Sequence, residues 1–322
     1  MKRLALVTVV ILAMMSACAV KAPCPAVSPS PAADTKTFAY EPTDITPEAK
    51  PLKEEAHITI TQLKFKVSDL EGIPKSFKAF LIKPKKLAGR VPAIIILPPT
   101  EGDYELLLDF GRFFAERGYV AMVVKRRGSF FNPERVDISY DHKLMIQTVI
   151  DVRRSIDWLQ KQEYVDPEKI GIMGISLGAI IAELSTAVDK RIKAAAFFLG
   201  SSELDQVLQK TGYSRLIAYR RTLEDKLEGT RSEKFYRVKE QLANIDPKNY
   251  GRYIDPKKVI FICARFDAII PYSISKKTIC NLGNPEAYCV PAGHYSSFFF
   301  KGWALKRVFQ HFEKIFSPPP AS

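Results

Sequence analysis

The chain has 322 residues, which is enough for one large α/β domain or two small ones. Its hydrophobic content of 47% and charged content of 26% are ordinary for a globular protein, but its formal net charge of +13 is strongly basic. This charge indicates either attraction to anionic surfaces or substrates, or a basic surface that is simply solvated. The lysines and arginines are scattered and no cluster of aromatic residues lies among them, so the composition gives no support for nucleic-acid binding.

The N-terminus predicts an export signal. A basic start is followed by an apolar stretch over residues 4–14, which is too short to cross a membrane as a mature helix. The small residues before Cys18 resemble the lipobox of bacterial lipoproteins, although Met15 stands where leucine is usual. The resemblance implies a signal peptide over residues 1–17 and lipidation of Cys18, which would anchor the protein to a membrane. The alternative is ordinary signal cleavage at an Ala-x-Ala pattern around the same cysteine.

The residue after this cysteine is Ala19, which resembles the pattern of lipoproteins that are sorted to an outer membrane. We therefore expect the protein in the cell envelope, lipid-anchored and facing the periplasm. Residues 18–52 are rich in proline, alanine, serine and threonine, which predicts a tether or merely a frayed N-terminus. The folded domain is expected over residues 53–316, followed by a tail at residues 317–322.

The folded part begins with short segments that alternate apolar and polar residues, as half-buried strands do. Residues 58–61 and 63–67 have this pattern, and residues 78–83 are predicted to close an antiparallel hairpin. Continuous apolar runs then alternate with helical segments, which predicts an α/β fold with a doubly wound, mostly parallel sheet covered on both faces. The predicted strands lie at residues 92–97, 119–124, 169–173, 192–199, 259–264 and 287–290, and the predicted helices at residues 106–117, 143–162, 179–184 and 303–316.

A Gly-x-Ser-x-Gly motif, formed by Gly174, Ser176 and Gly178, lies between a predicted strand and a predicted helix. A serine on such a sharp turn is held in a strained backbone geometry, and small neighbours let the strand and the helix pass close to it. The start of the following helix offers free N–H groups and a positive dipole end to an oxyanion. The motif therefore predicts a nucleophilic serine at position 176.

Residues 200–257 interrupt the alternation of strands and helices, because they contain no strand pattern and are highly charged and helix-prone. In a doubly wound sheet, an insertion at this place lies over the carboxyl ends of the strands, where ligands bind. We therefore expect a helical lid. The alternative is a helical excursion on the edge of the domain.

A serine hydroxyl is a poor nucleophile near neutral pH and needs a base, which an acid must orient. Of the four histidines, His294 directly follows the last predicted strand, at the sheet edge where the serine is expected. Asp267 follows the strand before it, with Asp205 and Glu203 as reserves after an earlier strand. The chain order Ser176, Asp267, His294 matches the order known for serine nucleophiles on a strand-to-helix turn.

Together these segments resemble an α/β-hydrolase over residues 57–316, and most closely the branch of dienelactone-hydrolase-like and acyl-peptidase-like esterases. The resemblance implies that Ser176 is the nucleophile, Asp267 the orienting acid and His294 the general base. The stretches that carry it are residues 92–100, 126–128, 157–159, 165–167, 174–178, 266–267, 271 and 293–294.

In this family two backbone N–H groups hold the oxyanion, and the resemblance implies that one of them belongs to Leu177. The other comes from the loop after the first buried strand, where many relatives carry His-Gly before the donor. This chain has Pro98 and Pro99 there, and proline has no N–H to donate. Thr100 is therefore the predicted second donor, with Glu101 as the alternative. The carboxylate of Glu101 would oppose an oxyanion unless it points away, binds a cationic substrate group or is simply solvated.

Cys280 and Cys289 flank the segment that leads to the predicted base, and in an oxidising compartment a disulfide between them would brace its loop. Two buried free thiols are the alternative. Cys263 is expected to be a core thiol within its strand, and Cys24 to be alone in the tether. The histidines and cysteines lack metal-ligand spacing, so neither a metal nor an organic cofactor is expected.

These features predict an exported serine hydrolase that cleaves a small-molecule carboxylic ester through an acyl-enzyme intermediate. Because the same three side chains also support amide cleavage, a serine peptidase is the alternative among enzymes. The alternative that is not an enzyme is a lipoprotein that uses the scaffold only for binding. The helical insertion is expected to decide which acyl and alcohol groups bind.

Overall fold

The computed structural model describes residues 18–19, 24, 34–42, 44–71, 73, 75–102 and 104–317. The predicted signal peptide and most of the predicted tail lie outside the described residues. Among the described helices, none has the length and apolar character that crossing a membrane requires.

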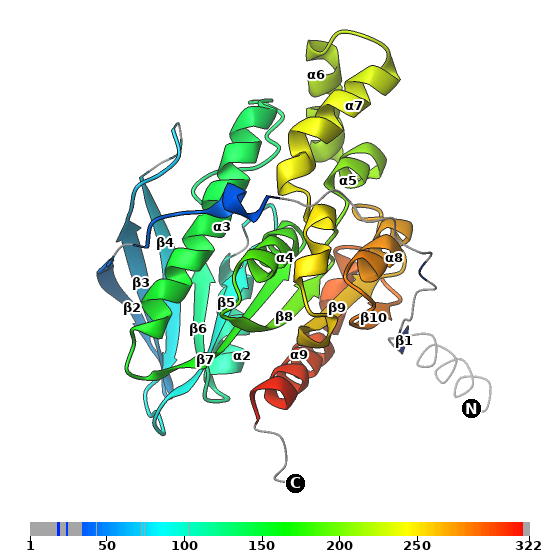
Figure 1. Cartoon of the computed structure of the whole chain (residues 1–322). Helices are drawn as coiled ribbons and strands as arrows, with labels where there is room; N and C mark the ends of the chain where they lie inside the picture. Colours follow the sequence, from blue (N-terminus) through cyan, green and yellow to red (C-terminus); the bar gives the residue numbers. More distant parts are fainter. Residues whose placement is uncertain are drawn as a thin grey trace, which may run out of the picture.

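Within the described residues, ten strands form one sheet in the order β1-β10-β9-β8-β7-β5-β6-β4-β3-β2 (Figure 1). The six strands from β6 to β10 in this order pair in parallel, whereas the other pairs are antiparallel. The sheet is therefore mostly parallel, and the predicted N-terminal hairpin is confirmed as β3 and β4. The strand bounds are β1 (Cys18–Ala19), β2 (Glu48–Glu54), β3 (Ile58–Lys66), β4 (Ser76–Pro84), β5 (Val91–Leu97), β6 (Val120–Val124), β7 (Val165–Ile175), β8 (Ile192–Phe198), β9 (Val259–Ala264) and β10 (Glu286–Val290).

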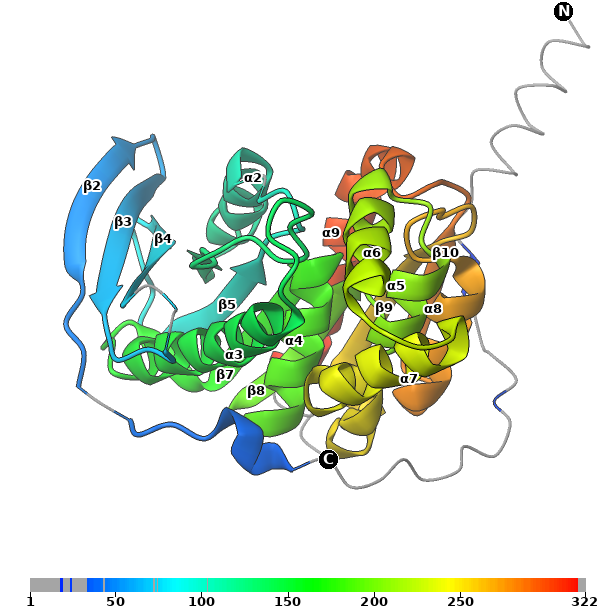
Figure 2. The same ribbon diagram turned by 90° about the horizontal axis from the view of Figure 1, so that it is seen from above.

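Helices cover both faces of this sheet (Figure 2). α2 (Tyr104–Ala115) and α9 (Lys301–Phe316) lie on one face. The other face carries α3 (Ile138–Gln160), α4 (Leu177–Val188) and α8 (Tyr272–Asn281). The predicted α/β class with a doubly covered sheet is confirmed.

β5 shows why the sequence of the central strands is apolar without interruption. Ile95 belongs to the core on the side of α3 and α4, whereas Ile94 and Ile96 belong to the core on the side of α2 and α9. All three side chains are fully buried. A strand that is covered on both faces needs an apolar side chain at every position, so the alternation that marks a half-buried strand is absent.

Three helices form the insertion between β8 and β9, namely α5 (Leu204–Lys210), α6 (Ser214–Lys226) and α7 (Arg231–Leu242). The described residues of the insertion contain no strand. The backbone N–H of Gly212 donates to the carbonyl oxygen of Ala268, after β9, at 2.6 Å. Arg215 donates to Ser129 Oγ, in the loop after β6, at 2.7 Å. Both partner loops follow the carboxyl ends of strands, so the insertion lies over that edge of the sheet, and we call residues 200–257 the lid.

The predicted tether is wrong over part of its length, because several of its residues join the domain. Glu48–Glu54 forms β2, which pairs antiparallel with β3 at the edge of the sheet. All seven side chains of β2 are exposed, so the strand is held by its backbone and leaves no hydrophobic pattern in the sequence. Phe38 is fully buried against Tyr250, and its carbonyl oxygen accepts a hydrogen bond from Arg153 at 2.6 Å.

The predicted disulfide between Cys280 and Cys289 is also wrong. Cys289 is bonded to Cys263, and the two are direct register partners on the neighbouring strands β10 and β9. Cys280, at the end of α8, is bonded to Cys24 instead. The Cα–Cα distances of 4.5 and 5.3 Å lie in the range that disulfides require. Spacing along the chain could not reveal these pairs, because both depend on which strands and segments become neighbours.

We predict that the oxidised protein contains the pairs Cys24–Cys280 and Cys263–Cys289, because these are the cysteines that the fold brings together. The measurement is mass spectrometry of a digest prepared after free thiols are alkylated without reduction. Two cross-linked peptide pairs are expected, and both should disappear in a reduced control. A peptide that links Cys280 to Cys289 would contradict the observed strand register.

Candidate active site

The turn between β7 and α4 carries Ser176 in a backbone conformation that few side-chain-bearing residues adopt, with φ of 53° and ψ of −118°. A side chain at position 174 would collide with the backbone carbonyl of Gly178. A side chain at position 178 would collide with the carbonyl of Leu97, at the end of β5. Both positions therefore require glycine, so the Gly-x-Ser-x-Gly spacing is a packing requirement of this turn.

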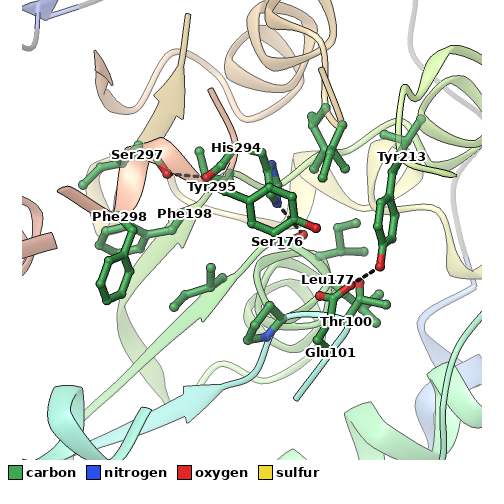
Figure 3. A pocket seen from close by; sticks show the side chains of 18 of the residues that line it. Thr100, Glu101, Ser176, Leu177, Phe198, Tyr213, His294, Tyr295, Ser297 and Phe298 are labelled. Atoms are coloured by element: carbon green, nitrogen blue, oxygen red, sulfur yellow. Dashed lines mark hydrogen bonds between the residues drawn. The ribbon is translucent and has the colours of Figure 1, made fainter. Parts of the chain in front are cut away.

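His294 points at Ser176 in Figure 3 and also reaches Asp267. Its Nε2 atom is 3.2 Å from Ser176 Oγ, and its Nδ1 atom is 2.7 Å from Asp267 Oδ2. Asp267 Oδ1 accepts hydrogen bonds from the backbone N–H groups of Ile269 at 2.8 Å and Ile270 at 2.9 Å. A carboxylate held in this way fixes the imidazole proton on Nδ1, which leaves Nε2 to accept the serine proton. The structure thus brings together the three side chains that the sequence selected.

The two reserve acids make contacts elsewhere. Asp205 accepts a hydrogen bond from Lys248 Nζ at 2.8 Å, within an ion pair. Glu203 accepts a hydrogen bond from Asn281 Nδ2 at 3.2 Å. Asp267 is therefore the acid that contacts the imidazole.

The two predicted oxyanion donors both line the cavity that contains Ser176. Leu177 is the first residue of α4, so its N–H is one of the groups at a helix start that have no acceptor within the helix. The positive end of the α4 dipole adds to the attraction for negative charge at this place. Thr100 lies in the loop after β5, and its backbone orientation depends on a side chain that the sequence did not single out.

Arg126, which follows β6, holds this loop by its backbone. Its guanidinium donates to the carbonyl oxygens of Pro98 at 3.0 Å, Pro99 at 2.5 Å and Thr100 at 2.6 Å. The C=O and N–H of a trans peptide point in opposite directions, so holding the Pro99 carbonyl turns the N–H of Thr100 away from the arginine. Arg126 therefore fixes the peptide plane of the predicted donor. Burial lowers the pKa of this guanidinium.

Glu101 points away from the serine, toward the lid. Its carboxylate accepts a hydrogen bond from the hydroxyl of Tyr213, the residue before α6 (Figure 3). Burial and this hydrogen bond raise the pKa of the Tyr213 hydroxyl, which therefore remains a proton donor. Of the alternatives open for Glu101, the structure selects an exposed side chain that pairs with the lid rather than one that faces an oxyanion.

The cavity beside Ser176 has a volume of about 540 Å³. The lid contributes an apolar part of its wall, formed by Leu204, Val207, Leu208, Leu216 and Leu242. Further apolar side chains come from the sheet and the other loops, among them Phe131, Ile175, Phe198, Ile262, Ile269 and Val290. A cavity of this size and lining binds hydrocarbon surface and fixes orientation through few polar groups.

A model of the dienelactone hydrolase family matches residues 77–244 of the chain. YtaP of Bacillus subtilis (strain 168), whose name assigns it to the hydrolases, is 28% identical over 145 residues, which is 39% of this chain and 48% of that protein. The chain spans about half or less of the length of the curated relatives that it matches.

Solved structures share the fold. Acetyl xylan esterase 1 from Thermoanaerobacterium sp. JW/SL YS485 superposes with a TM-score of 0.66 at 20% identity, over 85% of this chain and 89% of that one. The acetyl xylan esterase from Paenibacillus sp. R4 gives a TM-score of 0.64 at 19% identity, over 83% of this chain and 89% of that one. At these identities the likeness concerns the fold alone.

We predict that Arg126→Lys slows the reaction of Ser176 with a fluorophosphonate probe by about 10- to 100-fold. Lysine keeps the charge, but its single nitrogen replaces the planar fork whose two terminal nitrogens hold the three carbonyl oxygens. The Thr100 N–H then loses its fixed direction, and complete loss of one oxyanion donor costs about 10²–10³ in rate. The measurement is the second-order rate constant for labelling, taken on variants whose circular dichroism matches that of the wild type. Arg135→Lys is the matched control, because Arg135 donates to the Ser129 carbonyl and not to this loop. Equal labelling rates for folded Arg126→Lys and wild type would contradict the positioning role.

Proposed function

Because the chain belongs to the dienelactone hydrolase family, we propose that it cleaves carboxylic esters through a covalent acyl intermediate on Ser176. The observation that carries the proposal is the hydrogen-bonded series of Ser176, His294 and Asp267 at the strained turn. The names of the two acetyl xylan esterases that share the fold favour esters over amides as substrates.

In the first half of the reaction, Ser176 Oγ attacks the ester carbonyl carbon while its proton passes to His294 Nε2. The imidazolium that forms is stabilised by the Asp267 carboxylate, 2.7 Å from Nδ1. The carbonyl oxygen becomes an oxyanion, which accepts hydrogen bonds from the N–H groups of Leu177 and Thr100. When the tetrahedral intermediate collapses, the ester C–O bond breaks and Nε2 returns its proton to the leaving alcohol.

In the second half, water takes the place of the alcohol. His294 Nε2 removes a proton from the water as its oxygen attacks the acyl carbon, and the same two N–H groups hold the second oxyanion. Collapse then breaks the bond to Ser176 Oγ, which recovers its proton from Nε2. The products are the carboxylic acid and a regenerated enzyme.

The apolar walls of the cavity favour an ester with a hydrocarbon arm. Most side chains that line the cavity are apolar, and its two charged linings are Glu101, which is paired with Tyr213, and Lys301. Each methylene that moves from water into such a cavity contributes about 0.8 kcal/mol to binding. The proposed substrate is therefore a small-molecule ester with a hydrocarbon acyl or alcohol group.

We also propose that the protein is exported and anchored to the membrane by lipidation of Cys18, at an outer membrane and facing the periplasm. The lipobox-like sequence supports this proposal. The two disulfides support it as well, because disulfides persist in oxidising compartments and are rare in reducing ones. They use Cys24, Cys263, Cys280 and Cys289, and the fifth cysteine of the sequence is Cys18.

Two other functions are open to the same scaffold. A serine peptidase would use the three side chains in the same roles, with an amine as the leaving group. A binding lipoprotein would use the cavity without chemistry, but it would have no need for the strained backbone at Ser176 or for an imidazole held between hydroxyl and carboxylate. The geometry therefore favours a reactive serine.

We predict that Ser176→Ala abolishes labelling by a fluorophosphonate probe and lowers hydrolysis of p-nitrophenyl esters by at least about 10⁴-fold, because it removes the hydroxyl that His294 contacts. Ser273→Ala is the matched control, since Ser273 is an exposed serine on α8 and should leave both readouts unchanged. Wild-type protein that takes up no label would refute the catalytic function. Faster turnover of aminoacyl amides than of esters would assign the protein to the peptidases.

We predict that kcat/KM for p-nitrophenyl esters rises with acyl length from acetate to octanoate, by about fourfold per methylene until the cavity is filled. The reason is that each added methylene is buried against the apolar lining while the leaving group stays constant. Steady-state kinetics over the series give the measurement. Val207→Trp, which narrows the lid wall of the cavity, should shorten the preferred chain without lowering kcat/KM for acetate. A flat or falling series in the wild type would contradict a hydrocarbon arm in this cavity.

A further inference from the structure

Four large aromatic side chains on two loops are exposed, and we call them the aromatic rim. Phe266 is 70% exposed, Tyr295 66%, Phe298 43% and Phe299 87%. Phe266 lies after β9, and the other three lie in the segment between β10 and α9. The described part of the chain exposes only two other large hydrophobic side chains, Leu52 and Tyr236, so the rim is a concentration rather than the scatter that a surface normally shows.

The two loops of the rim lie side by side. The backbone N–H of Phe266 donates to the carbonyl oxygen of Ala292 at 2.9 Å, which joins the loop after β9 to the loop after β10. Tyr295 and Phe298 line the cavity as well as the surface (Figure 3). Phe299 points outward from the 3-10 turn at Ser296–Phe300 and does not line the cavity. Two of the four rim side chains, Tyr295 and Phe298, are therefore exposed to solvent and also line the cavity that contains Ser176.

The segment that carries Tyr295, Phe298 and Phe299 and continues into α9 has a positive net charge. Residues 291–310 contain three cations, Lys301, Lys306 and Arg307, and no aspartate or glutamate. The Lys301 ammonium lies 4.3 Å from the centre of the Phe298 ring, and Arg265 precedes Phe266 as an exposed residue. The one exposed carboxylate that lines the cavity, Glu101, is paired with Tyr213.

We propose that the aromatic rim docks on an anionic lipid bilayer, and that the ester enters the cavity from this surface. Exposed aromatic rings insert at the level of lipid headgroups, and neighbouring lysines and arginines attract anionic lipids. Both components are present here on adjacent loops, and two of the four rim side chains, Tyr295 and Phe298, also line the apolar cavity. Docking is independent of chemistry, whereas the membrane-borne ester as substrate rests on the proposed function.

A local fluorescence measurement tests docking. Phe299→Trp in the full-length protein is mixed with vesicles of phosphatidylglycerol and phosphatidylcholine, and the wild-type signal of the two native tryptophans is subtracted. We expect a blue shift of the added tryptophan and quenching by brominated acyl chains, both weaker with phosphatidylcholine alone. Tyr236→Trp is the matched control, because this side chain is 59% exposed and belongs to α7, which lies across the molecule from the start of α9 (Figure 2). Because the readout is local, an N-terminal anchor cannot mimic it.

Absence of quenching for Phe299→Trp would overturn the proposal. A blue shift that depends on protein concentration without vesicles would overturn it too, since it would assign the rim to contact between copies of the chain. Quenching of Tyr236→Trp that is as strong as that of Phe299→Trp would show unspecific adsorption, and it would also overturn the proposal.

A kinetic measurement tests the supply of substrate. We expect Phe299→Ser to lower hydrolysis of an ester embedded in phosphatidylglycerol vesicles by at least tenfold and to leave dissolved p-nitrophenyl acetate within twofold. Tyr236→Ser should change neither rate. Equal rates on vesicles for Phe299→Ser and the wild type would overturn the proposal.

The two hypotheses fail separately. The variant that carries Phe299→Trp together with Ser176→Ala should still be quenched by brominated lipids, because docking needs no chemistry. Quenching without hydrolysis of any ester would refute the proposed function and leave docking. Hydrolysis of dissolved esters without quenching would refute docking and leave the proposed function.

Discussion

The structure depends on a backbone that must turn sharply at Ser176 with a φ of 53°. Such a conformation costs about 1–3 kcal/mol and persists only where the surroundings leave no other choice. Here the surroundings are a strand and a helix that both lie deep in the core. The N–H of Ser176 donates to the carbonyl oxygen of Phe198 on β8 at 2.8 Å, and α4 is buried over most of its length. The core packing of these two elements thus holds the serine in place.

The burial of α4 places one acidic side chain in the core. Glu183 lies on this helix, fully buried, and its carboxyl group is hydrogen-bonded by the hydroxyl of Ser202. Burial raises the pKa of Glu183 to about 8, so the group is protonated near neutral pH and adds no buried charge. A neutral carboxyl group is compatible with the tight packing that the turn at Ser176 needs.

The sequence predicts the centre of the candidate site well for a topological reason. Ser176, Asp267 and His294 each follow a strand of one parallel sheet, and parallel strands present their carboxyl ends at a common edge. Although 118 residues separate Ser176 from His294, the apolar runs of β7, β9 and β10 are enough to bring them together. Recognising the strands in the sequence is therefore sufficient to predict that these three side chains meet, even when the exact register of the strands is not known.

The features that the sequence does not predict depend on neighbours rather than on strand identity. β2 has no buried side chain, so no periodic pattern marks it. The pairing of Cys263 with Cys289 requires the register of β9 against β10. The role of Arg126 could be predicted only if it were known that the loop after β6 lies against the loop after β5. There the Arg126 guanidinium donates to three carbonyl oxygens. None of these relations is contained in local composition.

The surroundings of Ser176 have two sides, one that the lid holds by hydrogen bonds and one that contacts solvent. On one side, Glu101 and Tyr213 join the loop after β5 to the lid, and the backbone hydrogen bond from Gly212 to Ala268 fixes the start of α6. On the other side, Figure 3 places Phe298, on a segment that contacts solvent. Opening the first side would disturb the loop that carries Thr100, the predicted oxyanion donor. Access along the second side leaves that loop intact, so substrate exchange and oxyanion geometry need not compete.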